Sequence, residues 1–239
     1  MKVVSRWIGL LLLALLALQI YFVARIALMT VLAPESTAFQ RSEAYRIAHS
    51  TGHLPWRQQW VDYNQISDNL KRAVIASEDD AFIHHDGVDW ASLEKAWARN
   101  SKAEQRAEQR GSSKPPKVVG GSTITQQLAK NLFLSGERTL LRKAQELVLT
   151  MALELILGKR RILEIYLNNV EWGEGVFGAE AAAQHYYGKH AAQLSSMEAA
   201  RLAVMLPRPK YFEKLPNSPY VWGRASVITA RMPDAQLPE

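Results

Sequence analysis

Residues 78–89 read Glu-Asp-Asp-Ala-Phe-Ile-His-His-Asp-Gly-Val-Asp, and residues 120–134 read Gly-Gly-Ser-Thr-Ile-Thr-Gln-Gln-Leu-Ala-Lys-Asn-Leu-Phe-Leu. The first stretch is an acidic turn that carries histidine, and the second is a polar helix entered through two glycines. A hydrophobic core requires neither pattern. The two stretches therefore indicate a binding or catalytic surface in a helical domain.

The composition is that of a folded, basic chain. It has 239 residues, of which 48% are hydrophobic, no cysteine, and a formal net charge of +6. This length suits one domain with a good core, and the hydrophobic content excludes a disordered chain. The lack of cysteine excludes disulfides and thiolate metal sites without deciding the compartment. The positive charge suits anionic partners such as nucleic acid, lipid head groups or pyrophosphate-bearing substrates.

The N-terminal sequence decides between these classes of partner. Lys2 and Arg6 precede residues 7–24, which contain no charged residue, and apolar residues resume through residue 33. About 20 apolar residues span a membrane, and flanking positive charge stays in the cytoplasm. We therefore predict a single-pass anchor in the cytoplasmic (inner) membrane, with the main domain in the periplasm, where nucleic acid is excluded as a partner. A cleaved signal peptide is the alternative, which the long run and the lack of an Ala-x-Ala site disfavour.

The chain divides into a cytoplasmic tail (1–6), a transmembrane anchor (7–33), a juxtamembrane helix and loop (34–66) and the main domain (67–239). Residues 99–117 contain six Lys or Arg and end in Gly, Ser and Pro. This composition predicts a fraying helix end followed by a mobile, solvated loop, with a basic loop near anionic lipid as the alternative.

The main domain is predicted to be mostly α-helical. Apolar residues recur at helical spacing, and Ser or Thr followed three residues later by Glu or Gln marks two helix starts. No convincing alternating strand occurs, apart from a short one near residues 118–119. The expected helices begin at Ser67, run from Trp90 to about Arg106, begin at Thr123 with a Gln126 capping box, run from Leu140 to Leu157, and begin at Arg160, near Gly178, at Ser195 with Glu198, and near Pro219.

Glu78 is a candidate general base. It ends an apolar helical run and is followed by Asp79, and close carboxylates or partial burial raise a carboxyl pKa toward a useful value. An exposed acidic helix end is the alternative, but the spacing Glu78-Asp79-x-x-Phe82-x-x-His85-x-Gly87 favours a functional site.

A metal site at this turn is not expected. Its ligands would be His84, His85, Asp86 and Asp89, but adjacent histidines are poor co-ligands and the spacing matches no standard site. His85 is expected to fix the turn by hydrogen bonding.

A second polar surface follows from helical spacing. Gln127, Lys130 and Asn131 share one helix face, which suits hydroxyls and a phosphate oxygen, although a solvated face is the alternative. Arg142 and Glu146 lie one turn apart, and by themselves would be a surface ion pair worth at most about 1 kcal/mol.

Two apolar stripes complete the pattern. Trp90, Leu93 and Trp97 are interpreted as core packing, with contact to the membrane interface as the alternative. The predicted long helix carries a second stripe at Leu141, Ala144, Val148, Met151 and Leu155.

Three further motifs follow in order at residues 162–168, 173–189 and 194–211, so that five motifs cover residues 67–212. Their combination resembles the biosynthetic peptidoglycan glycosyltransferases of glycosyltransferase family 51, and the monofunctional members in particular. The resemblance implies a lysozyme-like, two-lobed helical domain with a cleft. The segment between the first two motifs is longer and more basic than the family pattern.

The resemblance also implies roles for individual residues. Glu78 falls on the catalytic base and Glu146 on a second active-site glutamate. Substrate-binding positions are implied at Asp79, His85, Ser122, Thr123, Gln126, Gln127, Lys130, Asn131, Arg142 and Lys143.

The implied reaction joins two lipid-anchored substrates. A growing glycan on undecaprenyl pyrophosphate is transferred to the 4-hydroxyl of lipid II, so cations must offset charge on the departing pyrophosphate. No cofactor is required, although Mg²⁺ at the pyrophosphate is compatible with this chemistry. Membrane lipid and cell-wall synthesis proteins are the expected further partners.

Two other functions are alternatives to glycosyl transfer. A lysozyme-like peptidoglycan hydrolase would use a similar fold but would need neither the cations nor the anchor. A non-catalytic cell-wall scaffold would not need all five motifs. Two transpeptidase motifs have partial matches, Ser-x-x-Lys at residues 92–95 and Ser-Asp-Asn at residues 67–69. Their order is reversed and the Lys-Thr-Gly motif is missing, so no transpeptidase activity is expected. A chain ending at residue 239 also leaves no room for a second domain.

Overall fold

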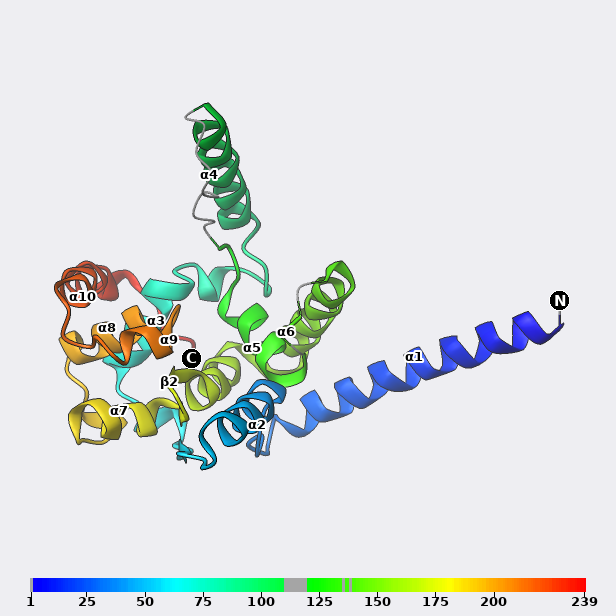
Figure 1. Ribbon diagram of the computed structural model, residues 1–239, viewed down its shortest axis with the longest axis horizontal. Coiled ribbons are helices and arrows are strands. Elements are labelled where there is room, and N and C mark those ends of the chain that lie inside the picture. The colour runs from blue at the N-terminus through cyan, green and yellow to red at the C-terminus, as the bar shows by residue number, and fades with distance from the viewer. Residues whose placement is uncertain (1, 110–119, 135, 138) are drawn as a thin grey trace.

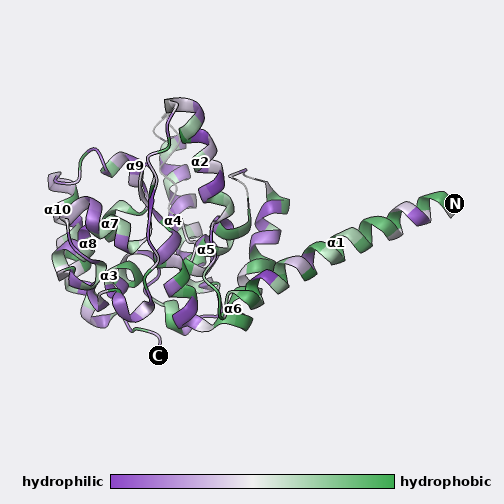
Figure 2. Cartoon of the chain, turned by 90° about the horizontal axis from the view of Figure 1, so that it is seen from below, coloured by the Kyte–Doolittle hydropathy of each residue, from purple (hydrophilic) through white to green (hydrophobic). Residues whose placement is uncertain are grey.

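An apolar helix, α1 (Lys2–Leu28), projects from the remainder of the chain in the computed structural model, which describes residues 2–109, 120–134, 136–137 and 139–239 (Figure 1). The span Val3–Leu28 is long and apolar enough to cross a membrane and is not buried inside the protein. Hydrophobic residues cover almost its whole length (Figure 2). Its C-terminal end is covered, where Ile26 is buried in the core together with Met29, which follows the helix.

The rest of the chain is mostly α-helical, as predicted. Both predicted capping boxes are present, at Thr123 with Gln126 and at Ser195 with Glu198, because the Ser or Thr oxygen accepts a bond from the N3 amide. The further helices are α2 (Ala38–Thr51), α3 (Asp68–Glu78), α4 (Trp90–Gln109), α5 (Ile124–Phe133), α6 (Leu140–Asn169), α7 (Ala179–Tyr187), α8 (Ser196–Met205), α9 (Pro209–Phe212) and α10 (Pro219–Arg231). Short 3₁₀ turns occur at Tyr63–Gln65, Phe82–His84, Ala191–Gln193 and Met232–Asp234.

The helices form two groups that share one core (Figure 1). In one group α3 packs against α8 and α10, and in the other α5 packs against α6, with α1 and α2 alongside. Helix α6 is broken at Gly158, whose φ of 70° only glycine adopts readily. The predicted helix to Leu157 and the predicted start at Arg160 are the two halves of α6.

A small sheet was not predicted. Strand β1 (Arg57–Gln58) pairs in parallel with β3 (Val176–Phe177), which pairs antiparallel with β2 (Glu171–Gly173). Strands of two or three residues are too short to show an alternating pattern. Gly175 permits the pairing, because a Cβ there would lie 1.8 Å from the carbonyl oxygen of Pro55. The strand expected near residues 118–119 and the latter part of the expected loop lie outside the described residues.

The core interpretation of the α4 stripe was wrong. Trp90 is 68% and Trp97 is 76% exposed, and α4 stands away from the two helix groups (Figure 1). The α6 stripe is exposed in the same way, with Leu141 at 83% and Leu155 at 88%. Apolar residues at helical spacing mark an apolar face, but they do not say what covers that face.

Candidate active site

Glu78 is the last residue of α3 and lies partly buried at the edge of a cleft. Its Oε2 accepts a hydrogen bond of 3.0 Å from Nε2 of Gln127 on α5. The hydroxyl of the buried Tyr166 on α6 donates to the other end of that amide, Oε1 of Gln127, at 3.0 Å. Tyr166 therefore fixes the amide so that its NH₂ group faces Glu78.

The surroundings of Glu78 suit a base. Burial raises the pKa of its carboxyl above the ordinary value, and the hydrogen bond from Gln127 opposes part of that rise. Burial also raises the pKa of Tyr166 well above its usual value, helped by the charges of Glu78 and Asp79, so that this phenol stays protonated and remains a donor.

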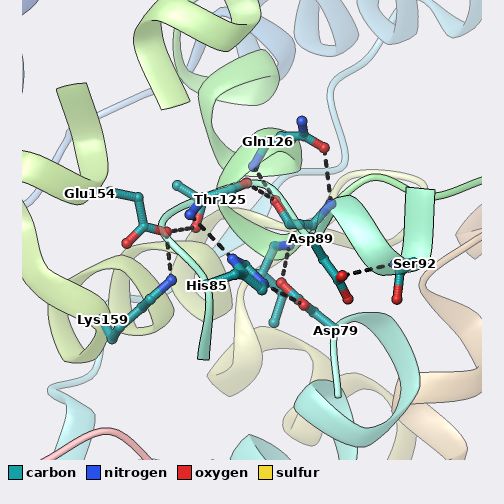
Figure 3. Close-up of polar contacts among 11 residues, drawn as sticks. Asp79, His85, Asp89, Ser92, Thr125, Gln126, Glu154 and Lys159 are labelled. Atoms are coloured by element: carbon teal, nitrogen blue, oxygen red, sulfur yellow. Dashed lines mark hydrogen bonds and ion pairs between the residues drawn. The ribbon is translucent and has the colours of Figure 1, made fainter. Parts of the chain in front are cut away.

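The turn after α3 is held by Asp79 and His85 (Figure 3). Oδ1 of Asp79 lies 2.8 Å from Nε2 of His85, and Oδ2 accepts a 3.0 Å bond from the backbone N–H of Ile124. The N–H of Gly87 donates to Nδ1 of His85 at 3.2 Å, so Nε2 carries the ring proton and donates to Asp79. Both ring nitrogens are thus used within the protein, as expected for a residue that fixes the turn.

The start of α5 is tied to the same turn. Oγ1 of Thr123 donates to the carbonyl of Gly87 at 2.6 Å, and Gln126 accepts from the backbone N–H of Thr123 at 3.2 Å. Gly87 has a φ of 87°, and a Cβ there would lie 2.6 Å from Cγ2 of Thr150 on α6. Thr123 and Gln126 are buried in this cap, and their predicted contacts with substrate stay predictions.

A further network bridges the break in α6 (Figure 3). Glu154 precedes the break and Lys159 follows it, and Nζ of Lys159 lies 2.7 Å from Oε1 of Glu154. Thr125 of α5 donates to the same oxygen at 2.6 Å, and Lys159 lies 4.7 Å from the centroid of the Phe82 ring. The two halves of α6 are therefore joined to α5 and to the turn after α3.

A cation cluster occupies the other end of the cleft. NH1 of Arg142 lies 2.8 Å from Oε2 of Glu146, and Nζ of Lys143 contacts Oε1 of the same carboxylate. Glu146 is only 3% exposed, so this pair is not the surface ion pair that the spacing alone would suggest. A cavity of about 420 Å³ is lined by the three clustered residues together with Gln127, Lys130 and Asn131. The predicted shared face of these α5 residues is confirmed.

A second cavity of about 400 Å³ adjoins the first. Ser122 lines both cavities and so lies where they meet. Glu78 and Asp79 line the second cavity, and the first extends to Glu43 of α2. The structure therefore places the residues predicted at the two ends in two adjoining cavities, which together are called the cleft.

Sequence reasoning missed several cleft residues. Lys95 and Arg99 of α4 line the second cavity, and their spacing of four on a predicted helix was the available indication. Arg231 of α10 also lines it and pairs with Asp80 at 2.9 Å. Nothing in the local sequence links these two positions, which lie 151 residues apart.

Comparison with known proteins gives the same assignment. A family model described as Transglycosylase matches residues 46–233. The chain belongs to the transglycosylase family. It is 52% identical over 239 residues to a biosynthetic peptidoglycan transglycosylase of Burkholderia thailandensis, covering 98% of this chain and 89% of that protein. Proteins of the same name from Herminiimonas arsenicoxydans and Paraburkholderia xenovorans are 50% and 48% identical, over 95% of this chain and 93% and 90% of theirs.

This transglycosylase has the predicted fold, a lysozyme-like helical domain of two groups of helices behind one N-terminal apolar helix. Its activity is peptidoglycan glycosyl transfer, as the family and its relatives indicate. In this transglycosylase, Gln127 both bonds Glu78 and lines the cavity that holds the cation cluster.

Proposed function

We propose that this transglycosylase extends glycan strands by moving a growing, undecaprenyl-pyrophosphate-linked glycan onto the 4-hydroxyl of the N-acetylglucosamine of lipid II. One observation carries the proposal. Of two adjoining cavities, one holds a carboxyl of raised pKa at Glu78 and the other holds three cations, Lys130, Arg142 and Lys143. A hydroxyl acceptor needs a base, and a pyrophosphate leaving group needs positive charge.

The chemistry assigns one role to each end. Glu78 takes the proton from the 4-hydroxyl as its oxygen bonds to C1 of the donor sugar. The C1–O bond to pyrophosphate breaks at the same time, and displacement from the opposite face turns an α-linked donor into a β-1,4 bond. The cations offset the negative charge that grows on the departing oxygen. Pyrophosphate leaves readily, so a strong general acid is not required.

Glu146 acts in this proposal through the cations that it holds. Its carboxylate bonds both Arg142 and Lys143, which fixes their side chains beside Lys130 and Asn131 in one cavity. Preorganised cations need not reorganise when charge develops, which is the source of their contribution.

The donor set does not fit a protein-held Mg²⁺. The Glu146 oxygens are engaged by two cations, and the Asp79 oxygens by His85 and a backbone N–H. Among the residues that the structure describes, no three His, Asp or Glu side chains are grouped closely enough to hold a metal ion. In this proposal Lys and Arg side chains compensate the charge on the pyrophosphate.

Both proposed substrates are lipid-anchored, and α1 would bring the cleft to the membrane that holds them. We propose that α1 spans the inner membrane with Lys2 and Arg6 in the cytoplasm and the cleft in the periplasm. A reporter fused after Glu239 should be active only if it functions outside the cytoplasm. Cytoplasmic reporter activity, or a mature N-terminus beyond about residue 25, would contradict this topology.

The function is tested by incubating the purified full-length protein with labelled lipid II, with and without the phosphoglycolipid inhibitor moenomycin. Inhibitor-sensitive glycan polymers are expected. Clearing of purified cell wall would instead support a lysozyme-like hydrolase, and a folded protein that gives neither result would support a non-catalytic scaffold.

A further inference from the structure

The apolar part of α1 contains one side-chain amide. Gln19 is the only Asn, Gln, Ser, Thr, His or charged residue between Trp7 and Ala24. An amide inside hydrocarbon is costly unless it finds a hydrogen-bond partner. Gln19 finds one on α6, where Nε2 of Gln19 donates to Oε1 of Gln145 and Nε2 of Gln145 donates to Oε1 of Gln19, both at 3.1 Å.

The contact continues along α1 toward the domain. The ring of Phe22 meets that of Phe133 edge to face, with centroids 5.4 Å apart, and the guanidinium of Arg25 lies 5.6 Å from the Phe133 centroid. One turn further, the carbonyl of Met29 accepts a 2.7 Å bond from Arg161 of α6. The C-terminal third of α1 is therefore packed against the catalytic domain, and Gln19 is the first polar contact in that run.

The position of Gln19 along α1 also indicates how far from the end of the helix its contact with α6 lies. It lies nine residues before the end of α1 at Leu28, which corresponds to about 14 Å along the helix axis. The N-terminal turns of α6 lie at the same level, and there Leu141 and Val148 are 83% and 52% exposed. A lipid environment would cover such residues and would also strengthen the need of both amides for each other.

Gln145 lies directly before Glu146 and two residues after Lys143. Successive residues point about 100° apart around a helix, so Gln145 can face α1 while Glu146 faces the cleft. A bond that fixes the rotation of this turn about its axis also fixes the direction in which Glu146, Arg142 and Lys143 point.

We propose that Gln19 and Gln145 are a positioning pair, through which the membrane helix holds the cation cluster in place relative to Glu78. The anchor is then part of the catalytic structure as well as a tether. This inference rests on the proposed function in one respect, because it assumes that the cluster serves the reaction.

The contact is tested by cross-linking, which needs no activity. The natural chain has no cysteine, so Gln19→Cys with Gln145→Cys introduces the only two thiols. A short bifunctional methanethiosulfonate reagent should join them within one full-length chain in membranes. The matched control is Leu18→Cys with Gln145→Cys, because Leu18 is 44% exposed and points about 100° away from Gln19. Cross-linking at least about tenfold faster at residue 19 supports the pair, and equal rates would overturn it.

The positioning role is tested with a cycle of variants. Gln145→Leu removes the amide while keeping a similar volume, and should lower kcat/KM for lipid II about fivefold, as for loss of an interhelical hydrogen bond. In an Arg142→Ala background the same change should cause a clearly smaller loss, because one of the two cations through which it acts is gone. A further fivefold loss there would show a general structural defect and overturn the inference.

Different measurements would reveal failure of the proposed function and failure of the positioning pair. Failure of the proposed function would appear in the wild-type protein, as absence of polymer from lipid II. Failure of this inference would appear only in the variants, as wild-type activity of Gln145→Leu or as losses that multiply with Arg142→Ala. Leu18→Ala, on the exposed side of α1, should keep wild-type activity in the same assay.

Discussion

Glu78 and Glu146 are two glutamates in the same cleft, and they differ in the groups that bond their carboxyls. Glu78 accepts a hydrogen bond from the neutral amide of Gln127, and burial raises the pKa of its carboxyl. Glu146 is almost fully buried and is bonded by Arg142 and Lys143. The first arrangement leaves a carboxylate that can take up a proton, and the second uses a carboxylate to arrange cations. Residue type alone does not assign these roles.

The largest expected effect comes from removing the proton acceptor. Glu78→Gln keeps the size and the contact with Gln127, but it should lower lipid II polymerisation about 10²–10⁴-fold, the usual contribution of general-base catalysis. The measurement is turnover of labelled lipid II by a variant whose thermal unfolding matches that of the wild type. Retention of more than about a tenth of wild-type turnover would mean that Glu78 is not the base.

The next effect comes from the cation end. Lys130→Ala should reduce polymerisation by about 10²-fold, comparable to the loss of one preorganised donor to a developing negative charge. Lys189→Ala is the matched control, because Lys189 pairs with Glu198 at 2.9 Å and lines neither cavity of the cleft. If the wild type clears purified cell wall and Lys130→Ala clears it equally well, the polymerase assignment fails.

A smaller effect on activity is expected when the hydrogen bonding of Glu78 is weakened by replacing a neighbouring residue. Tyr166→Phe removes the donor that orients Gln127, which weakens the bond that lowers the pKa of Glu78. The pKa of Glu78 should then rise further, and kcat/KM should fall about fivefold at neutral pH, as for one lost hydrogen bond. Because the base must be ionised, the acid limb of the kcat/KM profile should move to higher pH. A uniform loss at every pH would contradict this assignment.

The smallest effect on activity is expected at a third buried glutamate. Burial raises the pKa of Glu171 to about 7, yet Glu171 lines neither cavity of the cleft. Glu171→Gln should therefore keep activity within about twofold, as expected for a residue outside the reaction. A large loss of activity in Glu171→Gln would contradict the expectation that Glu171 lies outside the reaction.

Glu171 should instead affect stability. The pKa of Glu171 in the folded state exceeds the ordinary value of 4.5, so the folded state binds more protons than the unfolded state between about pH 4.5 and 7. The free energy of unfolding should fall as pH rises through that window, by on the order of 3 kcal/mol. Thermal unfolding of Glu171→Gln in detergent should lack this slope and should occur at a higher temperature than wild type at pH 8.

The parts of the site that could be predicted from the sequence depend on local spacing. The caps at Thr123 and Ser195 and the shared face of Gln127, Lys130 and Asn131 follow from the geometry of a single helix. The order of the motifs was enough to indicate the family. These features need no knowledge of how the helices pack.

The parts that could not be predicted depend on contacts between distant segments. Tyr166 meets Gln127 across 39 residues, and Arg231 meets Asp80 across 151. No local pattern encodes such pairs, because packing of whole helices sets them. The stripe of Trp90 and Trp97 was misread for a related reason, since an apolar face looks the same in sequence whether protein covers it or not.

The parallel pairing of β1 with β3 bears on how the chain folds while it is being made. Residues 57–58 cannot pair until residues 176–177 have been synthesised. Likewise, Gln40 of α2 cannot form its hydrogen bond to Asn169 until residue 169 has been synthesised. At about 5–20 residues per second this delay is on the order of ten seconds, during which the segment next to the anchor lacks its final partners. Nascent chains that stop before Phe177 should therefore remain open to protease between α1 and α3, and longer chains should become resistant there.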